Sequence, residues 1–292
     1  MYDGRDALRI LQTLALTAVA MFAFAANSLL CRLALGQGFI DPASFASIRL
    51  IAGATTLFLI VQLRLKQSKF DHADWLAALM LFAYVAFFSF AYLTLPAGTG
   101  ALILFGAVQV TMFSVGLRAG EMFRPVAWFG FALAIVGLVF LVSPGVAAPP
   151  AFGAAMMTIA GVAWGVYSLR GRGVTDPLSA TAGNFVRGAP FALVLSLLLA
   201  SNAHADSAGI VLAVASGAIT SGIGYVIWYA ALSRLSAIQA ATVQLSVPLI
   251  AAFGGVVLLS EVITPRLLGA SAAILGGVAL VLATRPRNER PR

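Results

Sequence analysis

The chain has 292 residues, of which 61% are hydrophobic and only 10% charged, and its mean hydropathy is +0.99. A water-soluble protein of this length could not cover so much apolar surface, because its outer shell has to be largely polar. The net charge of +8 would favour a nucleic-acid partner in a soluble protein, but here it indicates basic loops beside a membrane. We therefore expect an all-α integral membrane protein that lies in the lipid bilayer and binds no nucleic acid.

Apolar segments follow one another along the chain and are separated by proline, glycine and charged residues. A helix needs about 20 apolar residues to span the bilayer. The sequence therefore predicts ten transmembrane helices joined by short loops, with no soluble domain. The expected spans are 9–33, 43–64, 73–95, 97–117, 123–142, 150–170, 178–200, 207–231, 235–259 and 265–284.

The first apolar segment also has a feature of a cleavable leader. A short charged tail precedes it, and Ala23-Phe24-Ala25 resembles a signal-peptidase site. The same segment has a counterpart 140 residues later, so we expect it to be retained as the first helix. The one cysteine, Cys31, excludes an intrachain disulfide and is expected to be an inert small side chain.

Lysine and arginine are distributed unevenly over the predicted loops. Fourteen of them lie in the termini and in loops on the same side, whereas only Arg32 and Arg266 lie on the opposite side. Basic residues accumulate in cytoplasmic loops. The distribution predicts an even number of spans and both termini in the cytoplasm, as in a multi-pass protein of the bacterial inner membrane.

The two halves of the sequence are related. When the chain is shifted against itself by 140 residues, Glu121 and Pro125 coincide with Glu261 and Pro265. This match carries weight because acids and prolines are scarce here. Five helices per half is an odd number, so the second half must enter the membrane from the opposite side. Inverted repeats of this kind are typical of secondary transporters, whose substrate site lies between the halves.

Two stretches of the chain carry a resemblance to a known family. They are Leu95-Pro96-Ala97-Gly98-Thr99-Gly100-Ala101 with Gly120-Glu121, and Leu235-Ser236-Ala237 through Pro248 to Ser260-Glu261. They resemble the EamA-type family of the drug/metabolite transporter superfamily and, within it, the exporters of aromatic amino acids. The resemblance implies a basket of ten helices around a central cavity, built from repeats at 1–145 and 146–292. Ser260 replaces the usual glycine before the glutamate, a change we expect a helix end to tolerate.

Aromatic and uncharged polar residues within the spans are the candidates for substrate contact. An amphiphilic amino acid needs apolar walls and a few convergent hydrogen-bonding groups. The shift of 140 residues aligns Phe24 and Asn27 with Trp164 and Tyr167. The rival explanation is packing, and for the two glutamines it is hydrogen bonding between helices. The residues expected at the substrate are Phe24, Asn27, Tyr84, Phe88, Gln109, Trp164, Tyr167, Tyr225, Trp228 and Gln244.

Two arginines interrupt predicted spans, Arg49 in the second and Arg187 in the seventh. A buried charge costs at least ~2.5 kcal/mol, so each needs a partner or water. Either could dock a substrate carboxylate, and Arg187 is the candidate for that role. The favoured interpretation of both, and more strongly of Arg49, is structural: they satisfy helix-end carbonyls or extend to the membrane surface.

Glu121 and Glu261 stand shortly before Pro125 and Pro265. Proline suits the first turn of a helix, and an acid suits its positive N-terminal end. We therefore interpret both glutamates as stabilising the helices that follow them, with Thr264 as the N-cap of the last helix.

All ten acidic residues lie in tails, loops or predicted helix ends. Carriers driven by protons or sodium usually keep a titratable group near the midplane, so we expect facilitated transport by alternating access without an obligatory proton site. The predicted spans contain no His and no mid-membrane Glu, and the Asp within them is Asp74, at the very start of the third span, which argues against an intramembrane enzyme, a metal site or a cofactor.

The leading hypothesis is a carrier that exports amino acids with aromatic or hydrophobic side chains from the cytoplasm, with methionine and threonine as further candidates. The alternative is an EamA-type permease for another small metabolite or for a drug-like quaternary cation, which an aromatic cage would suit. A monomer is expected, with a dimer as the alternative.

Overall fold

The computed structural model describes residues 4–64, 74–118, 124–145, 147–171, 174–232, 234–235 and 243–283. Regular structure in this part of the chain is helical, apart from an isolated bridge between Ile40 and Ala205. The α-helices are α1 (Gly4–Gly36), α2 (Pro42–Arg64), α3 (Trp75–Ala91), α4 (Ala97–Arg118), α5 (Pro125–Val142), α6 (Ala151–Arg170), α7 (Pro177–Leu198), α8 (Ser207–Ala215), α9 (Gly224–Leu232), α11 (Ser246–Leu259) and α12 (Pro265–Ala283). Two other helical turns are η1 (Ala200–Asn202) and η2 (Ser216–Ile223).

Seven helices in the described part are long and apolar enough to cross a membrane, one of them the continuous rod Ser207–Leu232 made of α8, η2 and α9. Shorter apolar helices are α3, α11 and most of α12. Large apolar side chains point outward from these helices, for example Leu197 at 76% exposed and Phe253 at 69%. Lipid, but not water, accommodates such a surface. The chain is thus an all-α membrane protein.

Most predicted spans agree with the helices to within a few residues. The third prediction, 73–95, runs too far, because α3 ends at Ala91 and the chain then turns ahead of Pro96. The ninth prediction, 235–259, lies partly outside the described residues.

In that ninth region, α11 begins only at Ser246. Pro248 therefore occupies its first turn, where proline is tolerated. Pro190, in contrast, lies inside α7.

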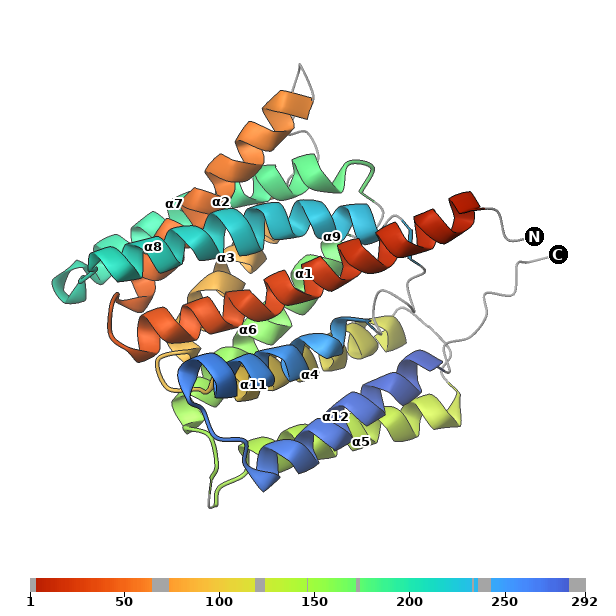
Figure 1. The fold of residues 1–292 in the computed structure, drawn as a ribbon. Coiled ribbons are helices and arrows are strands. Elements are labelled where there is room, and N and C mark those ends of the chain that lie inside the picture. The colour runs from red at the N-terminus through yellow and green to blue at the C-terminus, as the bar shows by residue number, and fades with distance from the viewer. Residues whose placement is uncertain are drawn as a thin grey trace.

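Helices far apart in the sequence pack together. α5 pairs with α12, α2 with α7 and η2, α6 with α3 and α4, and α1 with α9 and α11. Figure 1 shows α5 and α12 side by side on one flank, and the start of α1 and the end of α12 at the same end of the molecule. Glycines allow some of these close approaches. Gly161 and Gly165 of α6 form a G-x-x-x-G pattern, which is typical of closely packed helices. A Cβ on Gly161 would lie 2.6 Å from the Cβ of Ala107 on α4.

The segment η2 is a π-helical turn that the sequence analysis did not anticipate. Such turns occur within α-helices, frequently at functional sites. η2 packs directly on α2, because a Cβ on Gly217 would collide with the carbonyl oxygen of Arg49, and one on Gly222 would lie 3.0 Å from Thr56. This packing brings the polar side chains of η2 to the interior of the molecule.

At the end of the molecule opposite the termini, the loop after α1 is tied to the loop before α8. The Asp41 amide donates to the carbonyl of His204 at 2.9 Å, and the His204 amide donates to Oδ2 of Asp41 at 3.0 Å. The amides of Ala43 and Ser44 also donate to the Asp41 carboxylate. Burial works to raise the pKa of Asp41, but these donors outweigh it and hold the pKa below its usual value.

Candidate substrate site

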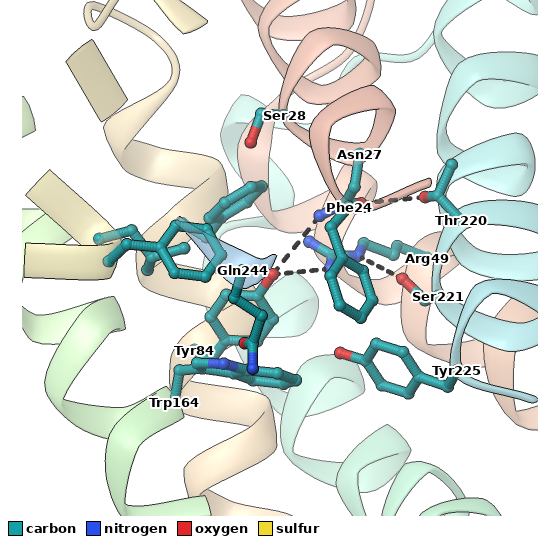
Figure 2. Close-up of a pocket in the computed structure, with 13 residues that line it drawn as sticks. Phe24, Asn27, Ser28, Arg49, Tyr84, Trp164, Thr220, Ser221, Tyr225 and Gln244 are labelled. Atoms are coloured by element: carbon teal, nitrogen blue, oxygen red, sulfur yellow. Dashed lines mark hydrogen bonds between the residues drawn. The ribbon is translucent and has the colours of Figure 1, made fainter. Parts of the chain in front are cut away.

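The described helices enclose a small pocket to which both halves of the sequence contribute (Figure 2). Its volume is about 30 Å³, room for a water molecule but not for an amino acid. A substrate of that size would therefore fit only after the lining side chains separate. The lining residues are Phe24, Asn27, Ser28, Arg49, Tyr84, Phe88, Leu104, Phe105, Trp164, Thr220, Ser221, Tyr225 and Gln244.

One wall of the pocket is aromatic. The ring of Trp164 on α6 lies 4.8 Å from that of Tyr84 on α3 and 5.8 Å from that of Tyr225 on α9. Phe24 on α1 meets Tyr225 edge-on at 5.9 Å. These centroid separations are typical of favourable aromatic pairs. Rings from four helices thus form a surface against which an apolar side chain can pack.

Arg49 is the charged member of the described lining, and it is only 1% exposed. Its Nη2 donates to the hydroxyl of Tyr84 at 3.2 Å and its Nε donates to Oγ of Ser221 at 3.3 Å. The guanidinium lies 5.3 Å from the ring centre of Tyr84 and 5.1 Å from that of Phe88. Its Nη1 is buried and has no hydrogen-bond acceptor among the residues that the structure describes. A buried charge with an unused donor is unfavourable in a resting protein.

The placement of Arg49 corrects the sequence-based interpretation, which assigned it to helix-end carbonyls or to the membrane surface. It lies two turns inside α2, beneath η2, and its side chain turns into the pocket. Arg187, the predicted docking cation, lies outside the described lining. Its guanidinium is 5.8 Å from the ring centre of Trp75, which is 61% exposed, and its Nη1 is likewise buried with no acceptor among the described residues.

A polar cluster borders Arg49. Oδ1 of Asn27 on α1 accepts from Ser216 at 2.7 Å and from Thr220 at 3.2 Å, both on η2. Nδ2 of Asn27 donates to the Tyr84 hydroxyl at 3.4 Å. Figure 2 shows the contacts of Asn27 with Thr220 and with Tyr84 beside Arg49. The cluster joins α1, α3 and η2, so the position of Tyr84 depends on all three.

The predicted site residues divide into two groups. Those that line the pocket are Phe24, Asn27, Tyr84, Phe88, Trp164, Tyr225 and Gln244. Tyr167 and Trp228 are outside the lining and support it, with ring centres 5.4 Å from Trp164 and 5.8 Å from Phe24 respectively. Gln109 is half-buried on α4 and also lies outside the lining.

Sequence reasoning missed the lining residues Ser28, Leu104, Phe105, Thr220 and Ser221. It singled out Arg49 as a charge inside an apolar span but favoured a structural role for it. No sequence signal existed for Thr220 and Ser221, because the π-turn η2 sets the direction of their side chains.

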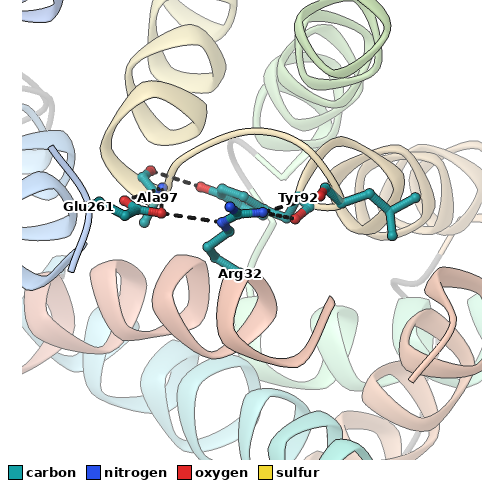
Figure 3. A network of polar contacts seen from close by, with 5 residues as sticks. Arg32, Tyr92, Ala97 and Glu261 are labelled. Carbon is teal, nitrogen blue, oxygen red and sulfur yellow. Dashed lines mark hydrogen bonds and ion pairs between the residues drawn. The ribbon is translucent and has the colours of Figure 1, made fainter. Parts of the chain in front are cut away.

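One turn beyond the pocket on α1, Arg32 forms a separate polar network (Figure 3). Its Nε donates to Glu261 Oε1 at 3.3 Å, and its Nη1 donates to the carbonyls of Tyr92 and Leu93 at 3.1 and 3.2 Å. The Tyr92 hydroxyl donates to the carbonyl of Ala97 at 3.2 Å. These contacts tie α1, α3, α4 and the turn after α11 together at the end opposite the termini.

Glu261 has a different role from the predicted one. Its carboxylate accepts from the Ala97 amide at 2.8 and 3.0 Å, so it stabilises the N-terminus of α4 and not that of α12. Ser260 adopts the left-handed conformation, with φ of 55°, in the turn that leads to Glu261. Thr264 accepts from the Leu267 amide at 3.1 Å and caps α12, as predicted. Glu121 lies outside the described residues.

Comparison with known proteins identifies the family. The sequence profile of the EamA-like transporter family matches residues 151–283. The uncharacterized protein PA1977 of Pseudomonas aeruginosa is 51% identical over 94% of this chain and 96% of its own length. The chain belongs to the EamA-like transporter family.

More distant similarities agree with this EamA membership. The threonine/homoserine exporter RhtA of Escherichia coli K12 is 28% identical over 67% of this chain and 66% of its own length. The uncharacterized transporter YoaV of Bacillus subtilis is 22% identical over 86% of this chain and 90% of its own length. A crystal structure of a protein that is 20% identical superposes with a TM-score of 0.62, covering 90% of this chain and 98% of that one. It shares the fold.

Proposed function

We propose that this EamA-family chain is a multi-pass carrier of the bacterial inner membrane that exports amino acids with aromatic or hydrophobic side chains. The observation that carries the proposal is the buried guanidinium of Arg49 facing an aromatic-walled pocket with an unused donor. A substrate carboxylate would accept from that donor, while the rings would pack against the substrate side chain. A relative named as a threonine/homoserine exporter supports an amino acid as cargo.

The proposed architecture is ten spans in two inverted repeats, 1–145 and 146–292, with both termini in the cytoplasm. The helix contacts support it. A shift by one repeat maps α1 onto α6, α3 onto the rod of α8 and α9, and α4 onto α11. Under that mapping, the pairs α1–α9 and α1–α11 correspond to α6–α3 and α6–α4. Exchanging the two repeats maps each of three further pairs onto itself, and these are α2–α7, α4–α11 and α5–α12. Such paired contacts suit a carrier in which one repeat moves against the other.

The proposed mechanism is alternating access without an obligatory proton site. The pocket has no room for an amino acid in this structure, and the Arg32 network lies just beyond it at the end opposite the termini. Export to that side requires the network to separate. The acids whose side chains the structure describes all lie at helix ends, and they are Asp41, Asp74, Asp176, Asp206 and Glu261.

The alternative of a quaternary cation as substrate is disfavoured by the same pocket. The aromatic rings would suit such a cation, but the guanidinium of Arg49 lies 5.3 Å from the ring centre of Tyr84, a principal part of that wall. Two like charges at this range repel each other strongly in a site shielded from water.

The direct test is flux in proteoliposomes with labelled phenylalanine, methionine and threonine, measured with and without a pH gradient. We expect saturable uptake that depends on the protein, competes with tryptophan and ignores the gradient. Arg187→Gln serves as a control, because it removes an arginine outside the described pocket lining. A folded preparation that carries none of these amino acids would contradict the proposal, and gradient-dependent uptake would contradict the uncoupled mechanism.

A further inference from the structure

Two hydrogen-bond acceptors beside Arg49 are already in use. Oδ1 of Asn27 accepts from Ser216 at 2.7 Å and from Thr220 at 3.2 Å. The oxygen of Tyr84 accepts from Asn27 Nδ2 at 3.4 Å and from Arg49 Nη2 at 3.2 Å. A carbonyl or hydroxyl oxygen offers two lone pairs. Both oxygens therefore have little capacity left to accept a hydrogen bond from a ligand.

Donors at the same place remain available. Tyr84 receives hydrogen bonds from two groups that can only donate, so its own O–H proton is directed elsewhere. Ser221 accepts from Arg49 Nε, which likewise leaves the serine proton to donate. Nη1 of Arg49 is buried without an acceptor among the described residues. A positive charge surrounded by surplus donors is a site for an anion, and a carboxylate matches the planar guanidinium.

The pocket offers far less to an ammonium group. None of the lining residues that the structure describes is acidic, and the charge that is present is positive. An α-amino group would meet the guanidinium of Arg49 and, on Asn27 and Tyr84, oxygens that already accept two hydrogen bonds each. The pocket is therefore built around one end of an amino acid, the carboxylate, with the aromatic wall for the side chain.

We propose that the carrier's substrate class is the monocarboxylate anion with an apolar or aromatic tail, with or without an α-amino group. This inference rests on the proposed transport function and narrows it. A carboxylate without an ammonium group moves one net negative charge across the membrane. An inside-negative potential drives that charge outward. At equilibrium it favours a concentration outside that is about 50-fold higher than inside for every 100 mV. Such transport needs no proton site at the midplane.

The test compares three labelled compounds in proteoliposomes at neutral pH: 3-phenylpropionate, phenylalanine and phenethylamine. They share a phenyl ring on a two-carbon chain and differ in whether they carry the carboxylate, both charged groups or the ammonium. Valinomycin and potassium gradients set the membrane potential, and protein-free liposomes give the passive leak. We expect saturable uptake of 3-phenylpropionate within about tenfold of the phenylalanine rate, faster when the interior is positive. Phenylalanine uptake should ignore the potential, and phenethylamine should not be carried.

The outcomes separate this inference from the proposed function. If phenylalanine is carried but 3-phenylpropionate is neither carried nor competes, the inference is overturned and amino acid export stands. Carriage of phenethylamine also overturns it. If none of the three compounds is carried by folded protein, the proposed function fails together with the inference. These comparisons use the wild-type chain and so do not depend on a variant that folds.

A pair of variants then tests the assignment to Arg49. Arg49→Gln should abolish flux of both carboxylates, whereas Arg187→Gln should retain it. Unchanged 3-phenylpropionate flux in Arg49→Gln would overturn the role of Arg49 as the anion-binding group.

Discussion

Arg32 and Arg49 lie in neighbouring regions of the interior, and they differ in what their guanidinium groups contact. Arg32 donates to a carboxylate and to two backbone carbonyls, at the end of the helices. Arg49 contacts a hydroxyl on each of two helices and keeps Nη1 without a described acceptor. Arg32 is satisfied within the fold. Arg49 is incompletely satisfied and lines the pocket, which distinguishes it from Arg187, whose buried Nη1 also has no acceptor among the described residues but which lies outside the described lining. The sequence does not show this difference in contacts, because each is a single arginine in an apolar helix, Arg32 near the end of α1 and Arg49 within α2.

The largest expected effect separates stability from transport at Arg49. Arg49→Met should reduce flux more than 100-fold, on the order of the loss when a buried charge-assisted hydrogen bond to substrate is removed. The unfolding temperature should be unchanged or higher, because an apolar side chain of similar volume removes the cost of a buried charge. The transport rate is measured as flux in proteoliposomes, and the stability is measured by thermal unfolding in detergent. Normal flux with lowered stability would reverse the roles assigned to the two arginines.

The opposite pattern is expected in the Arg32 network. Glu261→Gln leaves Arg32 without its counter-ion and weakens the acceptor for the Ala97 amide. We expect a loss of about 2–3 kcal/mol in stability, with a substrate KM changed by less than about twofold. A double-mutant cycle with Arg32→Gln should show coupling between the two residues. Additive losses would show that the ion pair contributes little.

A smaller effect is expected at the aromatic wall. Trp164→Ala removes the ring that packs against both Tyr84 and Tyr225. The KM for phenylalanine should rise about tenfold, and that for threonine less, because the smaller side chain uses less of the wall. Trp128→Ala is the matched control, since Trp128 packs on Phe113 away from the described pocket. Equal losses for the two variants would indicate a general packing defect.

The smallest effect concerns the turn that positions Glu261. Ser260 has φ of 55°, a conformation that costs a residue with a Cβ about 1–2 kcal/mol relative to glycine. Ser260→Gly should therefore stabilise the protein by about 1 kcal/mol. Ser260→Ala keeps the Cβ and should give no such gain. Thermal unfolding of the two variants side by side distinguishes relief of backbone strain from loss of the hydroxyl.

The sequence predicts the fold better than the site. Hydropathy locates the helices because a spanning helix must be apolar along its length, and the aromatic residues Tyr84 and Trp164 stood out within those spans. The role of Glu261 was mispredicted, because the group that donates to its carboxylate, the Ala97 amide, lies 164 residues away in the sequence. The role of Arg49 was mispredicted because its place near the start of α2 suggested a helix-end contact. The sequence does not show that η2 packs over this part of α2.

The π-turn η2 also sets the direction in which the side chains that follow it in the rod Ser207–Leu232 point around the helix axis. A π-turn holds more residues than an α-turn, and a single added or removed residue rotates the next side chains by about 100° around the helix axis. Tyr225 lies just after η2, so its direction depends on that count. A one-residue deletion in η2 would keep the composition of the pocket wall nearly intact and yet turn Tyr225 away from it. Among related chains, an insertion or deletion in this segment could therefore change the binding specificity even where the residues of the pocket are the same.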